Sequence, residues 1–361
     1  MDINQRNCNQ LPWDKTIWDD IDHSVHEECK RISIATKILP LMMPDSEDAL
    51  TVPSENIFVK TVDRERLLAI EEFETTPLVE LCVSFTLTPQ QVSLEGKIGK
   101  GRALAVRAAN LLERGCDAVI FKGQSAIDGV GGEQDPLFRD RKVVAKSYSK
   151  NNQRARLGLL QAPEAEGANP DIQIIQVPSV NSNPNQPNWA ENGTAKIHEA
   201  YGALQSGEGL DHSHYGPFFL ILHYVPFTNF FRPLANTLIR PYDTFVNLLT
   251  EMPYGHSSSQ SSSDKMPDMH EMYSYDKHPL YFGTGTVTPL TGIFASWGGN
   301  TMHLVVSKDT FTECTHQDKD GNYCFRLCKR FCLLLNDVTS VIRLEFLTES
   351  EQCTPSTPSP G

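Results

Sequence analysis

The chain has 361 residues, enough to bury a substantial core, and this length predicts about two domains or lobes. Its formal net charge of −13 argues against general binding to nucleic acid, because affinity for the phosphate backbone comes mainly from clustered Lys and Arg. No apolar run approaches the roughly 20 residues that span a bilayer, and the polar N-terminal residues are unlike a signal peptide. We therefore expect a cytoplasmic protein that contacts neither membrane nor nucleic acid.

The first predicted element is a helix that follows Pro12. Asp14 suits the position before its first turn, because a carboxylate there accepts a hydrogen bond from a backbone N–H that has no partner within the helix. Trp18 and Ile21 are spaced to lie on one apolar face, and the simplest interpretation of these two side chains is packing in the core.

An alternating strand over residues 77–88 is the clearest secondary-structure signal, because successive side chains of a strand point to opposite sides. One face carries Val79, Leu81, Val83, Phe85 and Leu87. Pro89 lacks the N–H that a sheet ladder needs and ends the strand. A segment with three glycines follows, and from Arg102 the pattern is helical. Gly115 is expected to weaken that helix and marks a candidate end for it.

Two regions have the composition of surface loops. Residues 131–193 combine a basic stretch with Pro-, Asn- and Gly-rich sequence and are predicted to be an inserted loop, partly disordered. Residues 255–278 begin with a serine tract, which buries too little apolar area to offset the cost of ordering. A helix near Thr194 lies between the two regions, and the Ser-, Thr- and Pro-rich tail, 348–361, is expected to be disordered.

Nine cysteines in a chain without a secretion signal predict reduced thiols rather than disulfides. Cys324, Cys328 and Cys332 share one face of a predicted strand over 323–335, and their simplest role is packing in the core. A metal cluster with Cys314 and His316 is the alternative, but it lacks the C-x-x-C spacing of structural zinc sites. Five further histidines are predicted to be exposed and to hold no metal: His212, His214, His256, His270 and His278.

No motif for catalysis stands out. Residues 318–322 begin like a calcium-binding loop, but Tyr323 stands where glycine is needed and no glutamate follows at the twelfth position. A hairpin turn is predicted there, and a second one at residues 297–300. The glycines of residues 96–101 lack the Lys-Ser/Thr that completes a phosphate-binding loop. We predict no enzymatic activity, no catalytic residue and no cofactor.

Three blocks of the sequence, in the same order, resemble the family 1 encapsulins, also known as the linocin-like bacteriocin family. The first is the strand and helix of residues 77–123, which end in Asp-Ala-Val-Ile-Phe-Lys-Gly. The second is the predicted N-terminal helix at residues 11–22. The third comprises residues 216–222, which resemble the family's buried strand, and the closing strands within 283–346. Encapsulins assemble into icosahedral protein shells.

The resemblance implies the α+β fold of tailed-phage major capsid proteins, the Hong Kong 97-like fold. It places an extended loop between the strand at 77–88 and the long spine helix that follows. The implied segments are an N-terminal arm with the cargo-facing helix, 1–44; a peripheral lobe with extended loop and spine helix, 45–130; the inserted loop, 131–193; an axial, pore-forming lobe that contains the serine-rich insertion, 194–307; closing peripheral-lobe strands, 308–347; and the tail, 348–361.

In function, the resemblance implies a subunit that assembles with copies of itself and encloses a cargo enzyme, such as a ferritin-like or peroxidase-type protein, which is held by a short targeting peptide. Arg240 and Tyr242 would border a pore, unless Arg240 simply pairs with an acidic neighbour. No tryptophan in residues 88–95 matches the one that stacks on a flavin in some encapsulins, so no flavin is expected. The residues implied for the peptide groove are Trp18, Ile21, Val25, Cys29, Ile32, Ser33, Thr312 and Cys314.

Two alternatives remain open at the level of sequence. A phage or prophage major capsid protein would share the fold and package DNA, but the acidic residues Asp19, Asp20 and Asp22 on the N-terminal helix argue against a DNA-lined interior. A hydrolase or protease would depend on a single nucleophile, for which no motif is present.

Overall fold

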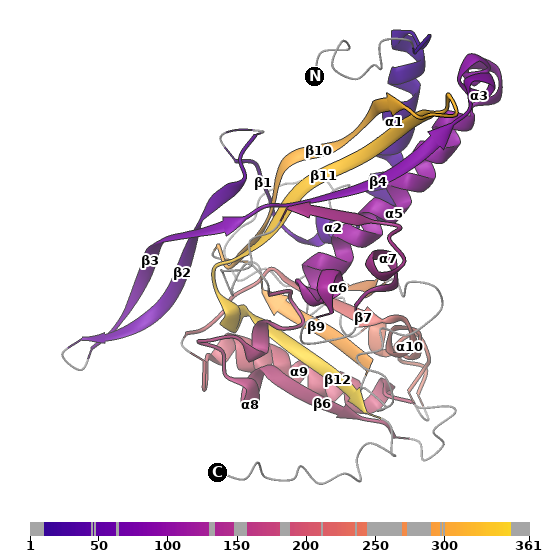
Figure 1. Ribbon diagram of the computed structural model, residues 1–361. Coiled ribbons are helices and arrows are strands. Elements are labelled where there is room, and N and C mark those ends of the chain that lie inside the picture. Colours follow the sequence, from indigo (N-terminus) through magenta and orange to yellow (C-terminus); the bar gives the residue numbers. More distant parts are fainter. Residues whose placement is uncertain are drawn as a thin grey trace, which may run out of the picture. The chain divides into compact units, whose positions relative to one another are not determined.

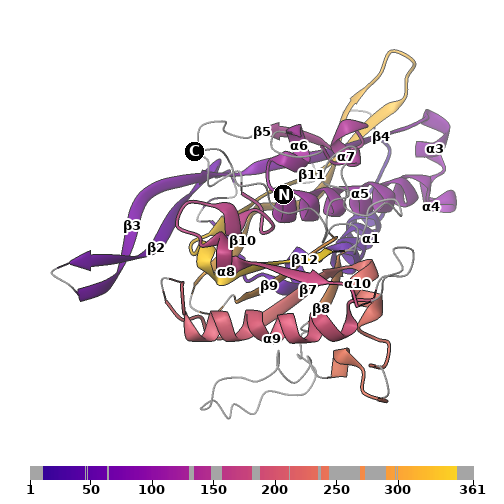
Figure 2. The same cartoon turned by 90° about the horizontal axis from the view of Figure 1, so that it is seen from below.

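The computed structural model describes residues 11–347 apart from 45, 47, 63–64, 130–133, 148–156, 181–187, 211, 235–236, 244–268, 273–289, 297 and 299. The chain, shown in two views in Figures 1 and 2, divides into two compact units. The first consists of Met1–Pro53, Thr75–Arg156 and Leu304–Leu334, and the second of Ser54–Glu74, Leu157–His303 and Leu335–Gly361. The tail at 348–361 and most of the serine-rich insertion lie outside the described residues.

The first unit is built on a five-stranded sheet, which contains the alternating strand predicted from the sequence. That strand is confirmed as β4, which is antiparallel to β11, with Leu327 opposite Val83 and Cys328 opposite Cys82. The order of the strands is β1 (Leu41–Met42), β10 (Met302–Gln317), β11 (Tyr323–Leu335), β4 (Val79–Leu87) and β5 (Val144–Ser147).

Two long helices, α1 (Lys15–Ile32) and α5 (Lys100–Lys122), pack against each other and run alongside this sheet (Figure 1). The predicted N-cap is confirmed, because the Asp14 side chain accepts a hydrogen bond from the Ile17 N–H at 3.0 Å. The sequence between β4 and α5, where an extended loop was expected, instead forms two short helices, α3 (Pro89–Ser93) and α4 (Glu95–Ile98). The remaining short helices of this unit are α2 (Ala35–Ile38), α6 (Ser125–Asp128) and α7 (Pro136–Arg139).

Gly115 does not end the helix, so that prediction was wrong. The helix continues for seven residues beyond it, to Lys122. A Cβ atom at Gly115 would lie 3.2 Å from Val143 and 3.6 Å from Leu81. The absence of a side chain therefore lets the helix pack closely against the segments that carry these two residues. Tertiary packing here outweighs the weak helix propensity of glycine.

The second unit contains another five-stranded sheet, with α9 (Ala190–Ser206) lying along one face (Figure 2). All six residues of β7 are buried, which confirms the predicted buried strand. Trp189, Phe230, Phe294 and Phe346 fill the core between helix and sheet. The order of the strands is β6 (Ile174–Pro178), β12 (Val341–Leu347), β9 (Leu290–Ser296), β7 (Phe218–His223) and β8 (Met269–Met272).

Short elements complete the described fold. The second unit also contains two short α-helices and two 3-10 helices in its described ranges: α8 (Pro170–Gln173), α10 (Tyr224–Asn229), η3 (Ala162–Glu164) and η5 (Val338–Ser340). Two long strands, β2 (Thr51–Val62) and β3 (Glu65–Pro77), form a two-stranded sheet of their own (Figure 1). None of the helices in the described ranges combines the length and the apolar character that crossing a membrane requires.

Three expectations about loops differ from the structure. Residues 131–193 are not a loop throughout, because they supply β5 and β6, which are one edge strand of each five-stranded sheet. Residues 318–322 do form the turn between β10 and β11. The hairpin predicted at residues 297–300 lies partly outside the described residues, and the strands on either side of it, β9 and β10, belong to different sheets. His214, predicted to be exposed, is buried. In each case a partner distant in sequence decides the outcome.

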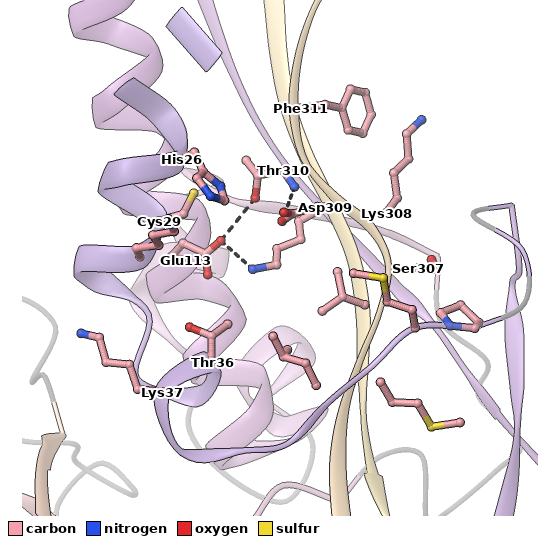
Figure 3. Close-up of a pocket in the computed structure, with 17 residues that line it drawn as sticks. His26, Cys29, Thr36, Lys37, Glu113, Ser307, Lys308, Asp309, Thr310 and Phe311 are labelled. Atoms are coloured by element: carbon pink, nitrogen blue, oxygen red, sulfur yellow. Dashed lines mark hydrogen bonds and ion pairs between the residues drawn. The ribbon is translucent and has the colours of Figure 1, made fainter. Parts of the chain in front are cut away.

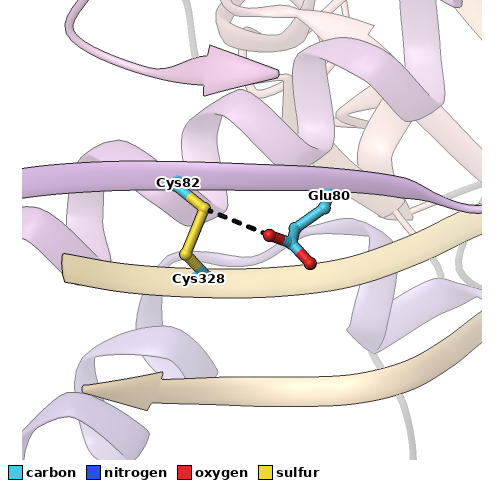
Figure 4. A group of neighbouring side chains, drawn as sticks. All are labelled: Glu80, Cys82 and Cys328. Carbon is cyan, nitrogen blue, oxygen red and sulfur yellow. Dashed lines mark hydrogen bonds between the residues drawn. A yellow bond between two sulfur atoms is a disulfide. The ribbon is translucent and has the colours of Figure 1, made fainter. Parts of the chain in front are cut away.

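The prediction that all the cysteines are reduced was also wrong. Cys82 and Cys328 form a disulfide across neighbouring strands (Figure 4). Their Cα atoms are 4.2 Å apart, close to the spacing of about 4.5 Å for a non-hydrogen-bonded antiparallel pair. Cys314 is disulfide-bonded as well. With Cys314 and Cys328 oxidised, the alternative metal cluster loses two of its thiolates, while Cys324 and Cys332 are free thiols.

Two glycines of α9 provide a matched test of this packing. A Cβ atom at Gly193 would lie 2.6 Å from Phe230 Cζ, whereas one at Gly202 meets nothing within 4 Å. We expect Gly193→Ala to destabilise the second unit by about 1–3 kcal/mol through overpacking, and Gly202→Ala to stabilise it by about 0.5–1 kcal/mol through helix propensity. Denaturant unfolding followed by circular dichroism checks both, and equal shifts for the two variants would contradict the packing of α9.

Candidate functional site

All eight residues that the resemblance assigns to a peptide groove lie in the first unit, and each is at most 8 % exposed. Five of them lie on the buried face of α1, and Ser33 follows as its C-cap. Trp18 packs edge-on against Trp13, with ring centroids 5.2 Å apart. Thr312 and Cys314 lie on β10. Of the eight, only Cys29 is among the residues that line the pocket described next.

The pocket has a volume of about 670 Å³ and is bordered by the C-terminal half of α1, by α2, β1 and β10, and by Glu113 of α5 (Figure 3). It is formed by residues of the first unit alone. In the close-up, His26, Cys29 and Glu113 lie near one another on the helical side, with Thr310 of β10 facing them. The structure thus provides a cavity next to the predicted groove residues.

A buried ion pair forms the polar part of the pocket wall. Lys329 Nζ lies 2.7 Å from Glu113 Oε1, and the side chains are 5 % and 0 % exposed. The hydroxyl of Thr310 donates to the same carboxylate oxygen at 3.3 Å. The second oxygen, Glu113 Oε2, and the buried hydroxyl of Ser307 have no hydrogen-bond partner among the described residues. Buried polar groups are normally satisfied, so these two atoms are exceptions within the described part of the pocket wall.

Electrostatics favour binding over nucleophilic chemistry in this pocket. Burial, and then the adjacent Glu113 carboxylate, raise the pKa of the Cys29 thiol to about 12. The thiol is therefore protonated at neutral pH, and a protonated thiol is a poor nucleophile. Burial by itself lowers the pKa of Lys329, but Glu113 outweighs this effect and leaves that pKa above the usual value. Lys329 is thus a permanent cation and not a general base.

Exposed apolar side chains and an open sheet edge border the pocket. Leu41, Met42 and Met43 are 58 %, 41 % and 80 % exposed. Strand β1 pairs with β10 only at Leu304 and Val305, and no other described strand covers the outer edge of β10. Unpaired backbone groups of this kind, together with apolar side chains, suit an extended peptide that adds to the sheet.

The backbone of β10 shows which of its groups face this edge. Leu304 N–H donates to Pro40 O at 2.9 Å, so it points toward β1. Every second residue of a strand turns its N–H and C=O to the same edge, which adds Val306, Lys308 and Thr310. Thr310 N–H donates to the Asp309 side chain at 2.7 Å instead of to a neighbouring strand.

The two residues predicted to border a pore lie in the second unit. Arg240 is exposed and forms two hydrogen bonds to Asp243, at 2.9 and 3.0 Å. Tyr242 is half-buried and stacks on Phe231, with centroids 4.7 Å apart. Arg240 therefore has the acidic partner that the alternative interpretation named, and both residues have partners within their own subunit.

Sequence reasoning missed the polar residues of the pocket. Glu113 interrupts the apolar face of α5, and Lys329 lies among the apolar residues of β11, so each charge stands where burial is expected. Two opposite charges in predicted core positions signal a buried pair, because a lone buried charge is too costly. Their separation of 216 residues hid the pairing. Met42 and Ser307 carried no comparable signal.

Neither a family model nor a curated protein matches this sequence. Solved structures match nearly the whole chain. A virus-like particle from Pyrococcus furiosus has a TM-score of 0.52 and 11 % identity, covering 91 % of this chain and 99 % of that one. The capsid of Myoviridae phage XM1 has a TM-score of 0.54 and 10 % identity, covering 88 % and 92 %. A structure from Mycobacterium phage Bobi has a TM-score of 0.52 and 12 % identity, covering 87 % and 90 %.

Identities this low establish the fold alone. The likeness extends over both units, and the strands and helices come from sequence blocks that resemble the encapsulins. The expected fold class is therefore confirmed: the chain has the α+β, Hong Kong 97-like fold.

Proposed function

We propose that this chain is the shell subunit of an encapsulin-type nanocompartment that assembles with copies of itself and encloses a cargo enzyme. The observation that carries the proposal is the likeness to a virus-like particle over 91 % of the chain. In a closed symmetric shell each contact recurs, so modest interfaces sum to a stable container. The compartment would lie in the cytoplasm. The protonated thiol of Cys29 in the pocket beside α1 supports a role in binding rather than catalysis.

The pocket beside α1 is the proposed seat of the cargo's targeting peptide. The peptide would extend β10 as an added strand and place apolar side chains on Leu41, Met42 and Met43. The lysines that border the pocket, Lys30, Lys37 and Lys308, favour a peptide with acidic groups. Among the groove residues implied by the resemblance, Cys29 would touch the peptide and the rest would position α1.

From the same resemblance we propose that Arg240 and Tyr242 border an opening of the shell. A ring of exposed arginines would favour the passage of anions. The pairing of Arg240 with Asp243 reduces this effect, because each arginine charge is then partly neutralised.

The decisive experiment is electron microscopy with mass spectrometry of the protein expressed alone and together with its genomic neighbours. Uniform hollow particles that retain one neighbouring protein are expected. Particles filled with nucleic acid would identify a phage-type capsid instead. A small oligomer without shells would overturn the assembly proposal.

A substitution of Met42 tests whether the pocket beside α1 binds the targeting peptide. We expect Met42→Asp to weaken binding of the cargo's terminal peptide roughly tenfold or more, because the lost apolar contact is worth about 1.5–3 kcal/mol. Shell formation should be unchanged. Ile98→Asp is the matched control, since Ile98 is 53 % exposed in the same unit but does not line the pocket. Fluorescence anisotropy of the labelled peptide measures both variants, and equal affinities would place the peptide elsewhere.

A further inference from the structure

Two histidines and an aspartate meet in the second unit, away from the pocket. His212 and His214 lie on the segment between α9 and β7, and Asp337 directly precedes η5. One ligand atom from each of the three residues lies within 4.8 Å of the other two. Residues separated by two positions in an extended segment point the same way, which brings the histidines to a common side. Their ring centroids are 4.6 Å apart.

The carboxylate of Asp337 is held with one oxygen facing the histidines. Its Oδ1 accepts hydrogen bonds from Thr339 N–H at 2.9 Å and from the Thr339 hydroxyl at 2.6 Å. Its Oδ2 lies 2.8 Å from His212 Nε2 and 3.8 Å from His214 Nε2. Oδ2 is fully buried. A buried carboxylate oxygen therefore lies beside the Nε2 atoms of two imidazoles.

We propose that His212, His214 and Asp337 form a binding site for a divalent transition-metal ion, with Zn²⁺ as the preferred ion. Imidazole nitrogen and carboxylate oxygen bind Zn²⁺ at about 2.0–2.2 Å, so neighbouring ligands of a tetrahedral ion lie about 3.3–3.5 Å apart. The observed separations of 2.8 and 3.8 Å lie on either side of this value. Small side-chain rotations that move the ligand atoms by a few tenths of an ångström would bring both separations to the tetrahedral value.

The Thr339 hydroxyl links the aspartate to the second histidine. It donates to Asp337 Oδ1 at 2.6 Å, so its hydrogen is used there, and His214 Nε2 donates to the hydroxyl oxygen at 2.9 Å. A metal bound at His214 Nε2 would replace this hydrogen bond, and the ring proton would then lie on Nδ1.

Solvent reaches the site on the side of His212, whose side chain is 24 % exposed, whereas His214 and Asp337 are each 2 % exposed. In the proposed site the metal ion would enter from this side and would take water as its fourth ligand. Three protein ligands with a water in the fourth position is an arrangement known for zinc.

The backbone around the histidines is already in place. His214 N–H donates to Leu204 O, in the last turn of α9, at 2.7 Å. Gly207 has a φ of 63°, and a Cβ atom there would lie 2.7 Å from the backbone of His212 and Ser213. The segment therefore packs directly onto the end of α9. A bound metal would link this helix end to the connection between β11 and β12 and stabilise the second unit.

The test uses the full-length protein, stripped of metal by a chelator and then titrated with Zn²⁺ against a chromophoric chelator. We expect one tightly bound equivalent per chain that His212→Gln and His214→Gln each weaken at least tenfold. His198→Gln is the matched control, because His198 is an exposed histidine on α9 of the same unit. Co²⁺ serves as the spectroscopic probe, since its visible absorption reports four-coordinate ligation by nitrogen and oxygen.

Thermal unfolding separates metal binding from a purely structural hydrogen-bond network. Zn²⁺ should raise the melting temperature of the wild-type and His198→Gln proteins but not of His212→Gln. A His212→Gln protein that is less stable while the wild type binds no Zn²⁺ would show that the cluster is only structural and would overturn the proposal. Unchanged Zn²⁺ binding by both His212→Gln and His214→Gln would mean that other residues hold the metal, and this result would also overturn the proposal.

Discussion

Replacing Lys329 by methionine is expected to lower the free energy of unfolding of the first unit by about 3–5 kcal/mol. The loss arises less from the missing attraction than from Glu113, which remains buried without a counter-charge. Glu113 is completely enclosed, and Lys329 is the cation that contacts it, at 2.7 Å. Because Glu113 holds the pKa of Lys329 above its usual value, the lysine is charged at about pH 6 to 9 and the loss should be constant there.

A second variant distinguishes this cause from a general packing defect. Glu113→Gln combined with Lys329→Met removes both charges and should restore most of the stability, because an uncharged pair of similar volume needs no counter-charge. Lys30→Met is the surface control, since Lys30 is 63 % exposed and should change stability by less than about 0.5 kcal/mol. Guanidinium unfolding followed by fluorescence gives the values. A double variant as unstable as Lys329→Met would refute the electrostatic explanation.

Trp18→Ala is expected to cost about 3–5 kcal/mol of stability in the first unit. Trp18 is 2 % exposed on the inner face of α1. It belongs to an aromatic cluster in which Trp13 stacks on Phe325 at 5.0 Å and Phe325 stacks on Phe85 at 5.2 Å. Truncation leaves a cavity between α1 and β11 that the surrounding rings fill only in part. The C-terminal half of α1, which carries Cys29 into the pocket, should then be less well held, and peptide affinity should fall as well.

Two controls bracket this expectation. Trp18→Phe retains an aromatic ring and should cost less than half as much, while Asp19→Ala changes an exposed neighbour on the same helix and should be close to neutral. Chemical denaturation of the three variants gives the comparison. A loss below about 1 kcal/mol for Trp18→Ala would mean that α1 is not packed against the sheet in solution.

Much of the local structure followed from short stretches of sequence. The alternation from Val79 to Leu87 predicted β4, Asp14 predicted the start of α1, and the apolar run at Phe218 predicted a buried strand. These signals depend only on residues close together in the chain, because side-chain periodicity and capping are local properties. The blocks in their order also indicated the fold class, which the likeness to particle and capsid structures confirmed.

The pocket, the disulfide and the proposed metal site were decided by the tertiary structure. The Glu113–Lys329 pair joins residues 216 apart, the Cys82–Cys328 bond joins residues 246 apart, and Asp337 meets His214 from a different connection of the sheet. Periodicity predicts which side chains turn inward but not which ones meet there. The sequence by itself thus determined the elements and their buried faces, whereas only the packing of those faces decided which charges, thiols and imidazoles became partners, because such contacts depend on chain segments brought together from far apart.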